Sequence, residues 1–267
     1  MVTDGVPVEV MQAVREGPVA TLSLDRPERP NALNVALIEA AAAQLATWEA
    51  DSGVRVVLLR GRGRGRAFCA GDDLGGMGDA EERAAMDFTL RREQGYERLF
   101  KVIYDLRKPV IAVLHGHAVG AGAMIALAAG IRIAADDTRI GFPFVQRGIT
   151  GGTALVARYV GFGKAHELLL TGDAVTGEEA ERIGLVTESV RTGTFDEAAA
   201  NWAARFASAP TKVLGFQKYQ LHHGMNQSVE SAFAINSFAA LLSRGAHDSA
   251  EGAAAFKEKR RPAFKGD

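Results

Sequence analysis

Two glycine-containing stretches have the composition to do chemistry through their backbone. GRGRGRAFCAGDDL (residues 61–74) follows the strand-like run RVVLL, and GHAVGAG (residues 116–122) opens an apolar, helix-like run. Small residues let a ligand approach the main chain, and backbone N–H groups can donate to a developing negative charge, most readily at a helix N-terminus. Taken alone, the first stretch is more often a solvated surface loop. Together, the two stretches predict a site built from main-chain amides.

Nucleotide, metal and serine-nucleophile chemistry fit the sequence less well. Gly120 and Gly122 match the first two glycines of G-x-G-x-x-G, but the third position is Ile125 and no acidic residue follows about twenty positions later. No serine stands in G-x-S-x-G, and no Cys/His spacing is typical of zinc. We therefore expect no dinucleotide, no metal and no other resident cofactor.

Composition favours one soluble globular unit. The 267 residues are 47% hydrophobic and 24% charged with a net charge of -1, so neither nucleic acid nor an anionic membrane is an expected partner. Residues 109–131 lack Asp, Glu, Lys and Arg, but histidines and glycines divide them into a short strand and a short helix of a buried core rather than a membrane span. A single cysteine and a polar N-terminus predict a cytoplasmic protein.

Periodicity then indicates the elements that would carry these loops. Residues 8–13 and 19–24 flank the turn REGP as a hairpin, and residues 36–50 have helical spacing. Strands and helices alternate afterwards, which is typical of an α/β fold. The further expected strands are 55–59, 110–114, 131–135 and 185–190, and the further expected helices lie near 81–107, 121–129, 153–160 and 164–171. From residue 195 onward, only helices and turns are expected.

Six motifs in one order resemble the crotonase, or enoyl-CoA hydratase/isomerase, superfamily. They are RPERPNALN (residues 26–34), AFCAGDDL (67–74), HGHAVGAG (115–122), GGTALVARYVG (151–161), TGDAVTGEEAERIGLV (171–186) and EGAAAFKEKRRPAF (251–264). The resemblance implies a crotonase-like spiral of ββα units over residues 1–194. It also implies a helical trimerisation region over residues 195–267, giving a homotrimer or a dimer of trimers. The implied substrate is an acyl-CoA thioester of fatty acid metabolism.

The resemblance also implies an oxyanion hole. By motif alignment, the thioester oxygen would lie between the backbone amides of Asp72 and Ala121. Binding of the rest of the substrate would fall to Arg29, Ala67, Phe68, Ala70, Gly71, Gly120, Met124 and Phe144. Among these, main-chain groups of residues 67–70 would lie near the adenine, and Arg29, with Arg26, Lys257 or Lys265, near the phosphates.

The sequence departs from the family's hydratases at both catalytic glutamates. Their positions are Met124 and Phe144 here, and the isomerase carboxylate, expected just before Gly151, is also missing. Hydration needs an acid and a base, which neither side chain supplies. Three hypotheses remain: a lyase or isomerase that uses an oxyanion-stabilised enolate, a catalytically weak acyl-CoA-binding member, and a conventional hydratase, against which the missing glutamates argue.

The remaining polar side chains allow both functional and structural interpretations. Asp72 could serve as an acid/base beside the thioester, or face solvent or cap a helix. Asp73 is expected in a cap or turn bond, and Cys69 as a small buried filler. Alternation along an extended segment predicts His115 and His117 on one face, with structural roles. An apolar pocket wall, or simple core packing, could be formed by Met124, Phe144, Phe142 and Met86. A solvated helix face is expected for Glu81, Glu82 and Glu93.

Overall fold

The computed structural model describes residues 10–63, 67–73 and 95–267 of the chain. The strands of these parts are β1 (Met11–Glu16), β2 (Val19–Leu24), β3 (Val56–Gly61), β4 (Val110–Leu114), β5 (His117–Val119), β6 (Ile131–Ala135), β7 (Arg139–Gly141) and β8 (Glu188–Val190). The helices are α1 (Val35–Ala50), α4 (Tyr96–Asp105), α5 (Ala121–Ala128), the 3-10 turn η1 (Val145–Arg147), α6 (Thr153–Thr171), α7 (Gly177–Arg182), α8 (Phe195–Ala207), α9 (Thr211–Gly224), α10 (Val229–Arg244) and α11 (His247–Glu258).

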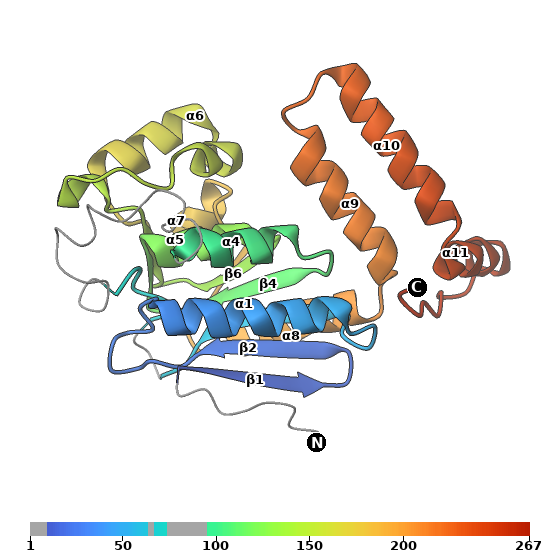
Figure 1. The fold of residues 1–267 in the computed structure, drawn as a ribbon, viewed down its shortest axis with the longest axis horizontal. Coiled ribbons are helices and arrows are strands. Elements are labelled where there is room, and N and C mark those ends of the chain that lie inside the picture. The colour runs from blue at the N-terminus through green and yellow to red at the C-terminus, as the bar shows by residue number, and fades with distance from the viewer. Residues whose placement is uncertain (1–9, 64–66, 74–94) are drawn as a thin grey trace.

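Six strands form the main sheet, in the order β1-β2-β3-β4-β6-β8 (Figure 1). The first two strands are antiparallel, and every later pair is parallel. Parallel strands need crossover connections, which the intervening helices provide. The loops after β3 and β4 therefore leave the same edge of the sheet, side by side.

Two hydrophobic layers cover the two faces of this sheet. Val110, Ala112 and Leu114 of β4 belong to the large core that includes α1, α4 and α5. Ile111 and Val113, which point the opposite way, pack with Ala199 and Ala203 of α8. A strand buried on both faces needs apolar residues at every position, which explains the run VIAVL.

A second, smaller sheet pairs β5 with β7 in parallel, and the sequence analysis missed it. His115 and His117 do not belong to one strand, because Gly116 between them has a positive φ of 60°. His115 is buried and stacks on Phe195, whereas His117 is exposed. The prediction of one shared face was therefore wrong, since a glycine turn resets the alternation.

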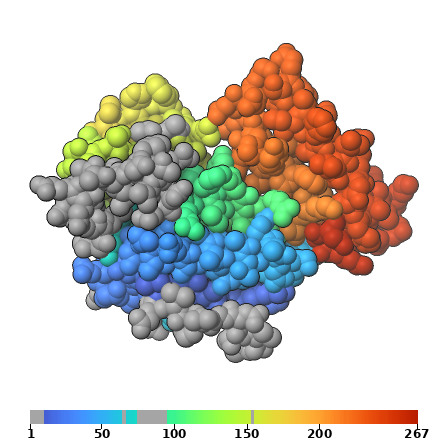
Figure 2. Space-filling view, in the orientation of Figure 1, coloured from blue at the N-terminus to red at the C-terminus, as the bar shows by residue number. Residues whose placement is uncertain are grey.

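The C-terminal helices α9 and α10 pack against each other as a helical hairpin that stands away from the sheet, and α11 follows at the end of α10 (Figures 1 and 2). Many large apolar side chains of this region are exposed: Tyr219, Leu221, Met225, Val229, Phe233, Phe238, Leu241, Leu242 and Phe256. The predicted boundary at residue 194/195 falls just before α8. Helix α8 still packs on the sheet. The part of the chain that projects away from the sheet is therefore α9–α11.

Most expected elements are confirmed. The hairpin, α1, β3, β4, α5 and β6 lie where the sequence predicts them within a few residues. The strand expected over residues 185–190 is reduced to β8, and α7 was missed. The two helices expected over residues 153–171 are confirmed, because α6 consists of two helical parts on either side of a kink at Gly161, where φ is 76°. None of the described helices combines the length and apolar character needed to cross a membrane.

Candidate active site

The first loop lies as a short extended segment beside the β4–β5 connection. The N–H of Phe68 donates to the carbonyl of His115 (2.8 Å), and that of Cys69 to His117 (3.0 Å). In return, the N–H of Val119 donates to Cys69 (3.1 Å). These three bonds fix the loop after β3 against the loop after β4.

Asn31, from the RPERPNALN motif, holds the first loop from the other side. Its Nδ2 donates to the carbonyls of Arg62 and Ala67, both at 2.8 Å, and its Oδ1 accepts from the N–H of Arg26 at 2.9 Å. The residue is buried with a positive φ of 56°, a conformation that asparagine tolerates. Asn31 is a positioning residue that the sequence analysis missed, although its place inside a quoted motif was the available signal.

Gly120 turns the second loop into α5. Its φ of 56° and ψ of -126° suit glycine alone, and its N–H donates to Gly141 of β7 (2.9 Å). The small sheet therefore anchors the start of α5. The N–H of Ala121, the first helical residue, has no intrahelical acceptor and points out of the helix end.

Two glycines let the loops touch. A Cβ at Gly122 would lie 2.3 Å from the carbonyl oxygen of Cys69, and a Cβ at Gly71 would lie 3.0 Å from that of Val119 and 3.6 Å from the nitrogen of Ala121. Any larger residue at Gly122 would push the loops apart. The amides that follow Gly71 and Gly120 are thereby brought together.

Neither of these two amides is used within the described structure. The N–H groups of Asp72 and Ala121 have no hydrogen-bond acceptor among the described residues, while their neighbours at Ala70 and Asp73 donate to Pro30 and Leu33. Two preorganised donors from separate loops can stabilise an oxygen that gains negative charge during a reaction. These two N–H groups are therefore available to such an oxygen.

The Asp72 side chain is largely buried beside these amides. Its Oδ1 is inaccessible and has no partner among the described residues. Burial raises the pKa of this carboxyl to about 6, against the opposing charge of Arg147. A carboxyl that titrates near neutrality can both give and take a proton at physiological pH.

Two further residues lie within electrostatic reach of Asp72, and the sequence analysis did not identify either. Arg147, in η1, lowers the pKa of Asp72, and the carboxylate contributes to raising the pKa of Tyr96 to about 12, after burial and Glu97. No sequence signal links these positions, which lie 75 and 24 residues from Asp72, because only the fold brings η1 and the start of α4 to the loops.

Asp73 and Cys69 have structural surroundings. The carboxylate of Asp73 accepts from the Arg26 guanidinium at 2.8 Å, and Arg26 also donates to the carbonyl of Ala32. This pair is almost buried, so Arg26 serves the loop rather than a phosphate. Cys69 is fully buried, which raises the pKa of its thiol to about 12 and confirms its role as an apolar filler.

Apolar side chains form the wall beyond the amides. Met124 is only 4% exposed, and Phe144 is half-buried. Their side chains converge with that of Phe142 around Gly152, where a Cβ would lie 2.8 Å from the Met124 sulfur and 3.3 Å from the Phe144 ring. No acid or base faces the site from these three positions.

The other predicted substrate-binding residues divide into accessible and buried groups. Arg29 is exposed, as a phosphate ligand would need to be, and Ala70 is half-buried. Ala67 and Phe68 have fully buried side chains, so they could contact a ligand only through the main chain. Met86, Glu81, Glu82 and Glu93 lie outside the described residues.

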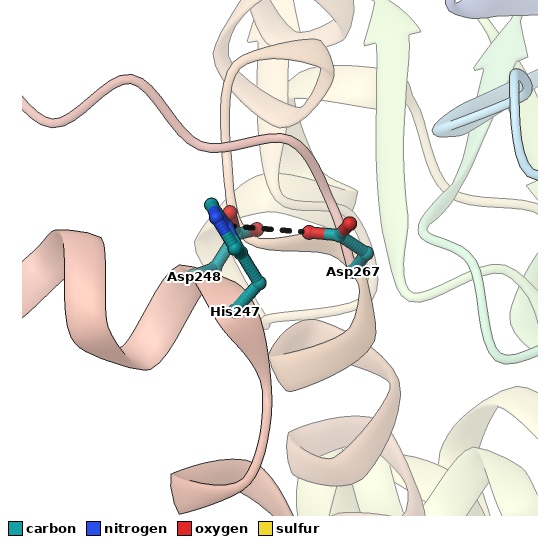
Figure 3. A group of neighbouring side chains, drawn as sticks. All are labelled: His247, Asp248 and Asp267. Atoms are coloured by element: carbon teal, nitrogen blue, oxygen red, sulfur yellow. Dashed lines mark ion pairs between the residues drawn. The ribbon is translucent and has the colours of Figure 1, made fainter.

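One group of side chains within the described part has the spacing to hold a metal: His247, Asp248 and Asp267 (Figure 3). Asp248 is buried, and its two oxygens accept the N–H groups of Lys265 and Gly266, each at 2.7 Å. His247 and Asp267 are exposed, and the distance from Nδ1 of His247 to Oδ1 of Asp267 is 3.7 Å. The cluster is explained by Asp248 fastening the C-terminal tail to α11.

Comparisons with known proteins agree on one relationship. The enoyl-CoA hydratase/isomerase family model matches residues 15–267. A protein of Rhodobacter capsulatus named "Probable enoyl-CoA hydratase" is 37% identical, over 95% of this chain and 96% of its own. The 1,2-epoxyphenylacetyl-CoA isomerase of Escherichia coli is 34% identical, over 96% of this chain and 98% of its own. The crystal structure of enoyl-CoA hydratase from Bacillus anthracis superposes with a TM-score of 0.86 at 31% identity, covering 97% of this chain and 100% of that one.

Proposed function

The chain belongs to the enoyl-CoA hydratase/isomerase, or crotonase, superfamily and has its α/β fold with a helical C-terminal region, and we propose that it converts an acyl-CoA thioester through an enolate. The observation that carries this proposal is the pair of unused amides, at Asp72 and Ala121, in two loops held in contact. Each such donor contributes about 3 kcal/mol to an oxyanion that forms in the transition state.

The proposed oxyanion hole acts on the thioester oxygen. When a proton leaves the α-carbon, its bonding electrons move into the carbonyl and the oxygen becomes negative. Because the loops that carry the amides of Asp72 and Ala121 are held in contact, these donors would need little reorganisation as the charge grows. Since both donors are main-chain groups, this part of the site is independent of side-chain identity.

Asp72 is the proposed proton-transfer group. Its ionised carboxylate would take the α-proton of a 3-enoyl thioester, which leaves a dienolate. The resulting acid would then give the proton to the γ-carbon, so that the double bond moves from C3 to C2. The buried Oδ1 and the pKa of about 6 support this role. Asp72 would then contribute its N–H to the oxygen and its side chain to the proton.

Efficient hydration is not part of the proposal. The two positions that hold the hydratase glutamates by motif alignment are Met124 and Phe144, which can neither activate water nor protonate carbon. Acid–base groups typically contribute about 10² to 10⁴-fold to such reactions. An apolar wall there also disfavours a bound water.

The same wall supports a second candidate, a protein that binds acyl-CoA with little or no turnover. A dry pocket beside two amide donors would hold a thioester well. This alternative differs from the first in one respect: whether the Asp72 carboxyl reaches the α-carbon.

Turnover in D2O distinguishes the candidates. The protein is incubated with 2-enoyl-, 3-enoyl-, saturated and malonyl-CoA, and the products are followed by mass and by free CoA. Deuterium uptake or double-bond migration is expected. Addition of water would restore the hydratase interpretation, whereas binding without any mass change would favour the second candidate.

Assembly and location complete the proposal. The exposed apolar side chains of α9, α10 and α11 support a homotrimer or a dimer of trimers that covers them. A cytoplasmic location fits a CoA-dependent enzyme of fatty acid metabolism with one buried cysteine.

A further inference from the structure

A surface groove lies on the far side of the apolar wall. It has a volume of about 830 Å³ and runs between the segment that contains η1 and the second half of α6. Its lining is almost wholly apolar and includes Phe142, Phe144, Ile149, Thr150, Phe162 and Leu170. Pockets of 300 to 1,000 Å³ take drug-sized ligands, so this groove exceeds what an acyl group of two to four carbons would fill.

The groove shares two wall residues with the candidate active site. Phe142 and Phe144 line it and also pack around Gly152 with Met124, three residues after the oxyanion amide of Ala121. Arg147, which follows Phe144 in the same turn, is close enough to Asp72 for its charge to lower the pKa of that carboxyl. The segment from Phe144 to Gly151 therefore borders the reacting centre on one side and the groove on the other.

Several apolar side chains at the outer end of the groove are left in water. Phe162 is 76% exposed, Leu170 68% and Ile149 54%. Exposed apolar residues are ordinary one at a time, but a concave cluster of them is typical of a binding surface. An extended hydrocarbon chain would cover this cluster without needing a single polar partner.

We propose that this groove holds the distal part of a long, unbranched acyl chain whose thioester lies at the Asp72 and Ala121 amides. This inference rests on the proposed function and names its substrate class: CoA thioesters of long-chain rather than short-chain fatty acids. Phe144 acts as the corner around which the chain passes from the oxyanion hole to α6. A specificity role thus replaces the catalytic one at that position.

Binding of saturated CoA thioesters of increasing length tests the proposal. Affinities of acetyl-, butanoyl-, octanoyl- and dodecanoyl-CoA are measured by calorimetry on the full chain. Each methylene buried in an apolar groove strengthens binding by about fourfold, so burial of only two of the eight methylenes added in dodecanoyl-CoA would make it bind more than about tenfold more tightly than butanoyl-CoA. Equal affinities for all lengths would overturn the groove while leaving the thioester site intact. Failure of every thioester to bind would overturn the proposed function itself.

Matched variants locate the chain. Leu170→Asp places a charge in the groove, and Val14→Asp, on β1, places one at an exposed apolar residue outside both the groove and α9–α11. Leu170→Asp is expected to weaken dodecanoyl-CoA binding about tenfold and to leave butanoyl-CoA binding unchanged, whereas Val14→Asp should change the affinity for neither thioester. Equal weakening of both ligands by Leu170→Asp would overturn the proposal.

The groove could instead hold part of a second copy of the chain. A variant that blocks the groove and a measurement of assembly distinguish this occupant from an acyl chain. Thr150→Trp fills the groove from an exposed loop position and should remove the preference for long chains. Sedimentation velocity is run on the same samples. Dissociation of an oligomer by Leu170→Asp or Thr150→Trp, with chain-length preference retained, would assign the groove to subunit contact and overturn the proposal.

Discussion

The two glycine loops and the apolar wall border the same site but are built on opposite principles. The loops offer main-chain donors and the Asp72 carboxyl, and their other side chains matter chiefly for being small, as at Gly71 and Gly122. The wall offers only carbon and sulfur, from Met124 and Phe144. The contrast teaches that charge stabilisation and substrate shape can be separated on this fold, so one can change while the other is kept.

The largest effect is expected when the proposed acid–base group, the Asp72 carboxyl, is removed. Asp72→Asn keeps the backbone amide but cannot exchange a proton, so turnover should fall by about 10² to 10⁴-fold with thioester affinity retained. Steady-state kinetics and calorimetry measure the two effects separately. Unchanged turnover would show that the loops contribute only their amides.

The next largest effect is expected when one of the two amide N–H groups is removed. Proline lacks an N–H yet is tolerated at the first position of a helix, so Ala121→Pro should lose the donor and keep α5. We expect turnover to fall by about 10² to 10³-fold. Circular dichroism checks that the helix persists. If a folded variant retained full activity, the second donor would have to lie elsewhere.

The buried carboxyl should also be visible in stability. Its folded pKa, about 6, lies above the ordinary value of 3.8, so the folded state binds the proton more tightly. This contribution is fully present below about pH 4 and is lost as pH rises to about 6. Asp72→Asn, which cannot ionise, should therefore be more stable than the wild type at pH 7 by up to about 3 kcal/mol, and equal to it near pH 4. Urea unfolding at both pH values tests the sign.

A structural variant tests the contact between the loops. Gly122→Ala would place a Cβ 2.3 Å from the Cys69 carbonyl, whereas Gly130→Ala meets nothing within 4 Å. Overpacking typically costs about 1 to 3 kcal/mol, so Gly122→Ala should unfold at lower urea while the control should not. If both variants behaved alike, close approach of the loops would not be required.

The smallest effect is expected when glutamates replace the two apolar wall residues, Met124 and Phe144. Met124→Glu combined with Phe144→Glu should give slow but measurable hydration of crotonyl-CoA, because both acid–base groups would then stand beside the proposed oxyanion hole. The control is the corresponding double glutamine variant, which has similar size and no ionisable group. Equal rates for the two double variants would mean that the added carboxylates do not reach the substrate carbons.

Much of the fold could be predicted from local patterns. VIAVL and IRIAA are strands with the predicted bounds because apolar runs of five residues between turn signals suit a sheet buried on both faces. The β5–β7 sheet was missed because each strand has three residues and they pair only after the chain has passed through α5 and β6. Prediction failed where pairing is short and non-local.

The sequence by itself determined that two glycine loops would expose backbone beside a helix N-terminus, and that Met124 and Phe144 would be apolar. Those properties depend on residue type and near neighbours alone. Only the tertiary structure decided that Asp72 is buried with an oxygen that has no partner among the described residues. It also decided that Arg147 and Tyr96 lie within reach of the Asp72 charge, and that Phe142 and Phe144 also line a groove along α6. Burial and charge interactions depend on segments distant in the chain, which no local pattern contains.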